Sequence, residues 1–232
     1  MTRANPAEFP TRAALMEAAA GDMAAALQKA IAERGEACIA LSGGSTPEPA
    51  YTLLAQHDLD WPRVTIALVD ERFVPPDHDA SNEKMLRRTL APALAKGAKL
   101  APMYAPARDV REAADIADAL YAPLHIDFAL MGMGEDGHTA SWFDGAEGLE
   151  AALDLSTTRK VVAICAPQAT GATERLTLTL AALRTAAPVT LLITGRAKRD
   201  LLLETHMHIS RTQMGNLYRL GGDAGPLVLW TD

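Results

Sequence analysis

Residues Met131–Phe143 read MGMGEDGHTASWF and follow directly on the apolar run Ile126–Leu130. A buried strand that leads into glycines, acids and a histidine is typical of a strand whose carboxyl end opens onto a ligand. The glycines allow positive φ and close approach of the backbone. His138 has the one side chain in this stretch whose ordinary titration range suits proton transfer near neutral pH. The stretch therefore predicts an α/β fold with a ligand site at this strand end.

The same stretch matches the dinucleotide-binding pattern G-x-G-x-x-G at Gly132, Gly134 and Gly137. That motif normally opens a helix in the first βαβ unit, with an acid about 20 residues further on. Here it lies past mid-chain, no clean helix start follows, and Asp154 lies in a helix-like Ala/Leu stretch. NAD binding is therefore disfavoured. A glycine-rich turn carrying a surface histidine without a catalytic role stays open as an alternative.

A second glycine-rich loop follows the apolar run Ala37–Leu41, which reads as a buried strand. The loop Ser42–Pro47 reads SGGSTP and leads into a predicted helix at about 48–56. A strand, a Gly/Ser/Thr loop and a helix start together direct N–H groups and hydroxyls at an anion. The loop lacks the Gly-Lys-Ser/Thr ending of a Walker loop, and Pro47 excludes a nucleophile elbow. A plain strand-to-helix turn is the alternative.

Charged side chains follow three further predicted strands or strand-like runs. Val64–Val69 ends in Asp70-Glu71-Arg72, and Val189–Thr194 ends in a Gly-x-x-Lys pattern that places Lys198 in a strand-to-helix loop. Charges at a strand end either face solvent or line a site, because they are costly to bury unpaired. Arg175–Leu180 alternates like a strand but runs into an Ala-rich, helix-like segment, so its boundary stays open.

The remaining elements alternate between helix and strand without a linker, which favours one doubly wound α/β domain over residues 1–232. We expect a mostly parallel, Rossmann-like sheet with helices on both faces. The expected helices are 11–34, ended by Gly35, then 82–95 and 109–124, and the expected further strands are 100–104, 161–166 and a last, edge strand at 228–230.

The composition excludes some classes of function. A net charge of −7 over 232 residues argues against non-specific nucleic-acid binding, but a local cluster of cations can still bind a phosphorylated ligand. No apolar run is long enough to span a membrane. The polar segment Met1–Arg12 is unlike a signal peptide, so the cytoplasm is the expected location. Cys38 and Cys165 lie in apolar runs and are expected to be buried, reduced and inert.

If all these strands belong to one parallel sheet, their carboxyl ends lie along one edge and the polar loops converge. Together they supply an anion-binding loop, cations, a histidine and acids. That set suits a small phosphorylated substrate and proton-transfer chemistry.

The motifs SGGSTP (Ser42–Pro47), DERFVP (Asp70–Pro75), Ser81-Asn82 and GMGEDGHTAS (Gly132–Ser141) resemble the 6-phosphogluconolactonase family. The resemblance runs from Ser42 to Lys198. It implies a Rossmann-like fold and hydrolysis of 6-phosphoglucono-δ-lactone in the pentose phosphate pathway, without a metal or an organic cofactor. The implied catalytic residues are His138, Asp70 and Arg72, and the implied phosphate-binding residues are Gly43, Gly44, Ser45, Thr46, Arg175 and Lys198.

A δ-lactone is an activated ester, so we expect water to attack it directly, with His138 taking the proton. Asp70 or Asp136 can orient the imidazole, and Arg72 or loop N–H groups can stabilise the oxyanion. The expected partner is the sugar-phosphate lactone alone, and the protein is expected to be a monomer or a small homo-oligomer.

Two other functions stay open. Glucosamine-6-phosphate deaminases share the glycine loop and the Gly-His pair, but that resemblance requires a carboxylate five residues after the histidine. Phe143 occupies that position here, and Asp144 is one residue out of register. A non-catalytic sugar-phosphate sensor would keep the glycine loop and Lys198 without needing His138.

The chain departs from the family pattern in two places, and both concern the rim of the pocket. Trp142–Asp144 replaces Leu-Phe-Pro, and 208–213 replaces a Pro-Ala helix start. The sequence leaves open the roles of Glu71, Glu135, Asp144, His206 and His208.

Overall fold

The structure, a computed structural model, describes residues 7–186, 188–207 and 227–232, without the side chains of residues 204–207 and 227. The departure at 208–213, including His208, and the side chain of His206 therefore lie outside the described residues.

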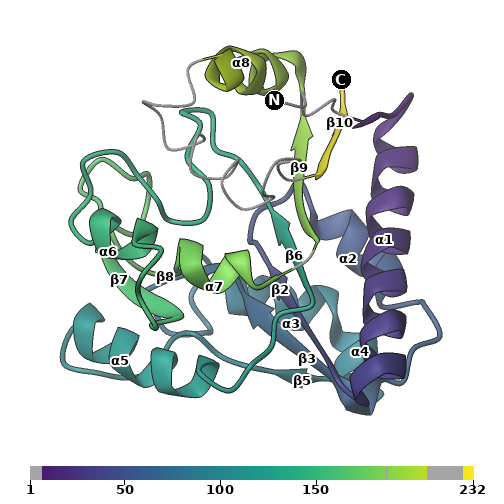
Figure 1. Cartoon of the computed structure of the whole chain (residues 1–232), viewed down its shortest axis with the longest axis horizontal. Coiled ribbons are helices and arrows are strands. Elements are labelled where there is room, and N and C mark those ends of the chain that lie inside the picture. Colours follow the sequence, from purple (N-terminus) through teal and green to yellow (C-terminus); the bar gives the residue numbers. More distant parts are fainter. Residues whose placement is uncertain (1–6, 187, 208–226) are drawn as a thin grey trace.

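A seven-stranded sheet, parallel at every pairing, crosses the described chain in the order β1-β10-β9-β6-β2-β3-β5 (Figure 1). Its strands are β1 (Ala7–Glu8), β2 (Ala37–Leu41), β3 (Val64–Leu68), β5 (Lys99–Leu100), β6 (Phe128–Met131), β9 (Val189–Thr194) and β10 (Leu227–Thr231). The mostly parallel α/β fold is thereby confirmed. The strand predicted at 228–230 is confirmed as β10, but its expected position at the sheet edge is wrong, because β1 pairs with the outer side of β10. The strand predicted at 100–104 overlaps β5 only at Leu100.

A second, antiparallel sheet holds three further strands in the order β4-β8-β7. They are β4 (Asp70–Arg72), β7 (Val161–Cys165) and β8 (Glu174–Leu178). Asp70–Arg72 does follow a strand of the parallel sheet, as expected, but it forms a strand of the second sheet itself. The strand-like run from Arg175 belongs to the second sheet as well, so the expectation that it ends at the edge of the parallel sheet is wrong. Val69 joins the two sheets, since its N–H donates to Leu41 of β2 while its carbonyl accepts the N–H of Leu178. The chain thus leaves β3 and enters the second sheet immediately.

The helices begin and end near the expected residues. They are α1 (Arg12–Arg34), α2 (Glu48–Leu54), α3 (Asn82–Thr89), α4 (Ala91–Ala95), α5 (Val110–Tyr121), α6 (Leu149–Leu153), α7 (Leu180–Arg184) and α8 (Arg196–Met207), with a 3₁₀ turn at Trp61–Arg63. Thr11 caps α1, and Gly35 ends it in the left-handed region at φ 81°. The single helix expected over 82–95 is broken at Leu90, because Pro92 lacks the N–H that would continue it.

The alternating run at 175–180 divides into a strand and a helix. It pairs as β8 through Leu178, after which the hydroxyl of Thr179 accepts the N–H of Ala182 and starts α7. The alternating part of the run is therefore a strand and the Ala-rich part a helix, and Thr179, the N-cap of α7, marks the boundary between them.

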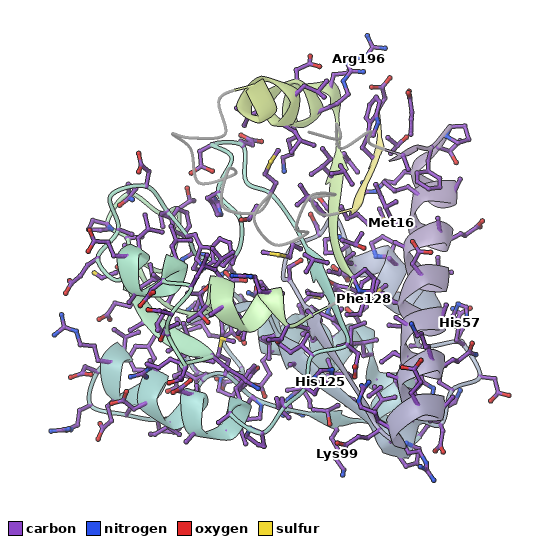
Figure 2. All side chains as sticks on the ribbon, in the orientation of Figure 1. Met16, His57, Lys99, His125, Phe128 and Arg196 are labelled. Carbon is purple, nitrogen blue, oxygen red and sulfur yellow. The ribbon has the colours of Figure 1, made fainter. Side chains whose placement is uncertain are left out.

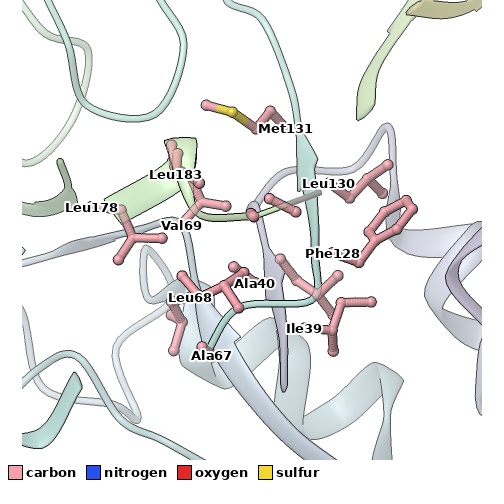
Figure 3. Packing of buried hydrophobic residues seen from close by; sticks show 14 of the residues in the cluster. Ile39, Ala40, Ala67, Leu68, Val69, Phe128, Leu130, Met131, Leu178 and Leu183 are labelled. Carbon is pink, nitrogen blue, oxygen red and sulfur yellow. The ribbon is translucent and has the colours of Figure 1, made fainter. Parts of the chain in front are cut away.

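Helix α1 packs along β2, β6 and β10, with α2 beside it, while β7, β8 and α5 form a layer on the other side of the sheet (Figure 1). Figure 3 shows this division at β6, where Phe128 and Leu130 point to one side and Met131 lies on the other with Leu178 and Leu183. Successive residues of a strand face opposite sides, so β6 is covered on both faces. The described helices include none that is both long and apolar enough to cross a membrane.

The amino ends of the parallel strands lie on one side of the molecule, and their carboxyl ends lie on the opposite side. In Figure 2, His125, which precedes β6, lies far from Arg196, which follows β9. Of the two cysteines, Cys38 is buried on β2, and burial raises the pKa of its thiol to about 12. Cys165 is only partly buried, contrary to expectation, because it lies at the end of β7.

Candidate active site

The order of the strands creates a crevice between β2 and β6. The chain moves from β2 outward to β3 and β5, then crosses to β6 and β9 on the other side. Ligands of open α/β sheets bind at the carboxyl ends of strands at such a reversal. The N–H of Ser42, directly after β2, donates to Leu130 of β6 over 3.1 Å, so the two loops start side by side.

A cleft of about 270 Å³ opens at this point. Its lining brings together all the predicted site residues except Asp136, namely Gly43, Gly44, Ser45, Thr46, Asp70, Arg72, His138, Arg175 and Lys198. It also includes residues outside the expected catalytic and phosphate-binding set, namely Ser42, Pro47, Asn82, Gly132, Met133, Gly134, Ala140, Leu192 and Ile193. The predicted convergence therefore occurs, although two of its contributors come from the second sheet.

The loop from Gly43 to Thr46 has unoccupied N–H groups. None of its four amides donates to an acceptor among the described residues. Gly44 has φ 99°, which favours glycine, and a Cβ on Gly43 would lie 1.8 Å from Oδ1 of Asn82. Arg12 supports the loop from outside by donating to the carbonyl of Ser45 over 3.2 Å. Free amides on a fixed loop can bind an anion.

The imidazole of His138 is held by a carboxylate of its own loop. Its Nδ1 lies 2.5 Å from Oδ1 of Asp136, which also accepts the backbone N–H of His138 over 3.2 Å. Burial alone would raise the pKa of Asp136, but the hydrogen bonds and charge of His138 lower it overall. The carboxylate therefore favours the tautomer with hydrogen on Nδ1 and leaves the Nε2 lone pair able to accept a proton. A Cβ on Gly134 would lie 2.3 Å from the imidazole, so glycine is required there.

Asp70 is held in a different way and does not contact His138. Its carboxylate accepts the hydroxyl of Ser141 over 2.7 Å, and its carbonyl accepts the amide of Asn82 over 2.9 Å. Of the two carboxylates that the sequence left open as partners of the imidazole, Asp136 is the one in contact. Asn82 connects Asp70 to the glycine loop, because its side chain lies against Gly43.

Glu71 lies fully buried beneath the site. Its carboxylate accepts the backbone N–H groups of Arg72, Asn82 and Glu83 and the hydroxyl of Ser81. Burial raises the pKa of Glu71, and these four hydrogen bonds partly oppose the rise. Glu71 therefore organises the start of α3 and through it the position of Asn82. The role of Glu71, which the sequence left open, is therefore to support the cleft.

The three cations of the cleft are each anchored by main-chain carbonyls. Arg72 donates to Ala80 over 2.5 Å, and its buried Nε has no partner among the described residues. Lys198 donates to Met133 over 2.8 Å. Arg175 donates through Nε and Nη2 to Ala172 and Thr170, and burial lowers its pKa.

Phe143 lies beneath this polar group. Its ring centroid is 4.1 Å from that of His138, and Cζ of Arg175 lies 5.0 Å from the same ring. The sequence identified Phe143 only as the residue that replaces a carboxylate. Ala140, also in the cleft, has φ 52°, a left-handed conformation that is costly for a residue with a Cβ. The sequence pattern could not predict the contacts of Phe143 or the backbone conformation of Ala140, because both are apolar residues inside a polar motif.

In the described part of the chain, no three His, Cys, Asp or Glu side chains gather closely enough to hold a metal ion. The carboxylate of Asp70, in the cleft, accepts the hydroxyl of Ser141, and the carboxylate of Asp136, beside the cleft, contacts His138.

Comparison with known proteins identifies relatives of the whole chain. Residues 10–214 match the family described as glucosamine-6-phosphate isomerases/6-phosphogluconolactonase. A 6-phosphogluconolactonase of Rhizobium meliloti (strain 1021) is 41% identical over 230 residues, covering 98% of each chain. One from Pseudomonas putida is 42% identical over 180 residues, covering 77% of this chain and 74% of the relative.

Solved structures show the same likeness in three dimensions. The crystal structure of a 6-phosphogluconolactonase from Shewanella baltica OS155 superposes with a TM-score of 0.88 at 32% identity, over 100% of this chain and 99% of that one. The family match covers most of the chain and the first relative covers nearly all of it. The chain therefore belongs to the glucosamine-6-phosphate isomerase/6-phosphogluconolactonase family.

Proposed function

We propose that this protein hydrolyses 6-phospho-D-glucono-1,5-lactone to 6-phospho-D-gluconate, the lactone-opening step of the oxidative pentose phosphate pathway. The observation that carries the proposal is an imidazole oriented by Asp136 in the same cleft as a loop of free amides and three cations. The names of the relatives in the 6-phosphogluconolactonase branch support the same reaction.

In the proposed mechanism, water attacks C1 of the lactone while Nε2 of His138 takes its proton. Negative charge then develops on the carbonyl oxygen, and Arg72 or amides of the glycine loop stabilise it. The tetrahedral intermediate collapses with cleavage of the bond between C1 and the ring oxygen. The imidazolium returns the proton to that oxygen, so the free acid and a hydroxyl are formed without a covalent enzyme intermediate.

The phosphate fixes the substrate at the other end. Gly43–Thr46 supplies amides and hydroxyls, and Arg175 and Lys198 supply positive charge. Two or more charge-assisted contacts at one end orient the ring against His138 and convert water attack into a positioned reaction.

The deaminase alternative is weakened by Phe143. An aromatic ring, and not a carboxylate, lies against the imidazole at 4.1 Å between centroids. The sensor alternative requires no oriented base, yet Asp136 holds His138 through Nδ1.

The test is a coupled assay with freshly generated 6-phosphoglucono-δ-lactone, run beside unphosphorylated gluconolactone and glucosamine 6-phosphate. We expect rapid hydrolysis of the phosphorylated lactone, poor hydrolysis of the unphosphorylated one, and no ammonia from the amino sugar. Ammonia release at a comparable rate would favour the deaminase. Equal turnover of both lactones would mean that the phosphate site is misassigned.

A further inference from the structure

Phe143 is a buried aromatic residue in contact with two functional side chains of the cleft. Phe143 is only 4% exposed to solvent. The ring planes of Phe143 and His138 are inclined by 31° at a centroid separation of 4.1 Å, and Cζ of Arg175 lies 5.0 Å from the Phe143 centroid. One apolar ring therefore contacts both the imidazole and the guanidinium.

Each of these two groups needs a second constraint. The hydrogen bond from Nδ1 to Asp136 fixes one atom of the imidazole but still allows the ring to swing about it. Arg175 is 4% exposed, and a guanidinium removed from water must recover favourable contacts. Two carbonyls supply hydrogen bonds, and the electron-rich face of Phe143 supplies an additional attraction for the positive charge.

Building on the proposed lactonase function, we propose that Phe143 is a positioning residue that fixes the imidazole of His138 and the guanidinium of Arg175 relative to each other. The ring thereby sets the spacing between the group that activates water and a group that binds the phosphate. It also stabilises the imidazolium that forms after proton transfer, since a positive charge is attracted to an aromatic face.

The other charges around the imidazole are on four elements. They are Asp136 of its own loop, Asp70 and Arg72 of β4, Arg175 of β8 and Lys198 of α8. A substitution at Phe143 leaves all of them in the chain. Phe143→Leu keeps apolar bulk but removes the aromatic face, whereas Phe143→Tyr keeps the face.

The experiment compares these two variants with Phe128→Leu, a matched loss of a buried ring from β6 in the core. The titration of the His138 ring is followed by NMR without substrate. We expect the midpoint to move to lower pH in Phe143→Leu, because the imidazolium loses its aromatic neighbour, and to return towards the wild-type value in Phe143→Tyr. Phe128→Leu should not move it.

The same variants are assayed with the lactone. Loss of one aromatic pair and one cation–π contact should lower kcat/KM by roughly 3- to 30-fold in Phe143→Leu, with recovery in Phe143→Tyr. The inference is overturned if the Leu variant titrates like the wild type, or if the Tyr variant behaves like the Leu variant. A wild type without lactonase activity would refute the proposed function alone, because the NMR titration decides the role of Phe143 independently.

Discussion

At the scale of single residues, the cleft contains cationic side chains that use only some of their N–H groups in hydrogen bonds within the protein. Lys198 contributes one hydrogen bond to Met133, and Arg175 uses Nε and Nη2 on two carbonyls. The remaining N–H groups of both side chains stay available in a cleft that also contains the free amides of the glycine loop. Such an arrangement holds cations in place before an anion binds, which lowers the ordering cost of binding.

The first prediction tests these cations. Lys198→Ala and Arg175→Ala should each raise KM with a smaller effect on kcat, because each loses a charge-assisted contact worth about 1.5–3 kcal/mol, or roughly 10- to 100-fold. Steady-state kinetics with the phosphorylated lactone measure this. Arg111→Ala is the control, since Arg111 pairs with Glu147 outside the cleft. An unchanged KM in either variant would show that the substituted residue does not bind the phosphate.

How far the sequence predicts individual residues depends on their chemistry. His138 and Asp136 stand out because they are titratable side chains among glycines after a buried strand. Arg72 stands out because it belongs to a run of three charges directly after the apolar run Val64–Val69. The structural roles of Asn82 and Phe143 cannot be predicted from the sequence, because they come from contacts between segments that are far apart along the chain. The sequence left the role of Glu71 open, because a charge at a strand end is compatible with chemistry or with support, and its hydrogen bonds to the start of α3 identify support.

At the scale of elements, the site rests on α3 and on the two loops that follow β2 and β6. The start of α3 has its orphan N–H groups satisfied by Glu71, and Ser81 provides the usual cap by accepting the N–H of Lys84. A buried carboxylate at a helix N-terminus is favoured by the helix dipole but disfavoured by desolvation. The raised pKa of Glu71 indicates that desolvation is the larger effect.

The second prediction follows from the direction in which the pKa of Glu71 is shifted. A carboxyl whose folded-state pKa is raised contributes stability below its unfolded pKa, and that contribution is lost as the pH rises through the folded pKa. The stability advantage of wild type over Glu71→Gln should therefore shrink as the pH rises from acid to neutral. Urea unfolding of both proteins across this range measures the difference, with Glu150→Gln, an exposed change in α6, as control. A difference that grows with pH would contradict the assignment.

The pattern of elements was largely predictable, and its errors have local causes. Apolar runs such as Ala37–Leu41 and Val189–Thr194 match β2 and β9 because strands covered on both faces are continuously apolar. The short strands β1 and β5 have two residues each, too few to carry a period. Pairing with β1 then turned the expected edge strand β10 into an internal one.

At the scale of the whole molecule, the site lies where two sheets meet. The parallel sheet supplies the glycine loop, the His138 loop and Lys198 from its carboxyl edge, and the antiparallel sheet supplies Asp70, Arg72 and Arg175. The sequence could not reveal the second sheet, because Asp70–Arg72 follows β3 after Val69 alone and reads as the charged end of that strand. The convergence was still predicted correctly, since β4 and β8 are bonded back to the carboxyl end of β3 through Val69 and Leu178.

The central claim is that this cleft is catalytic and that His138 is its base. The most direct measurement is the kcat of His138→Asn on 6-phosphoglucono-δ-lactone, paired with the affinity of the same variant for 6-phosphogluconate. Asparagine is roughly isosteric but cannot take a proton near neutral pH, so kcat should fall by about 10²–10⁴-fold. The phosphate contacts lie at the other end of the substrate, so affinity should stay within a few-fold of the wild type. Full activity of the variant, after correction for spontaneous hydrolysis of the lactone, would contradict the account.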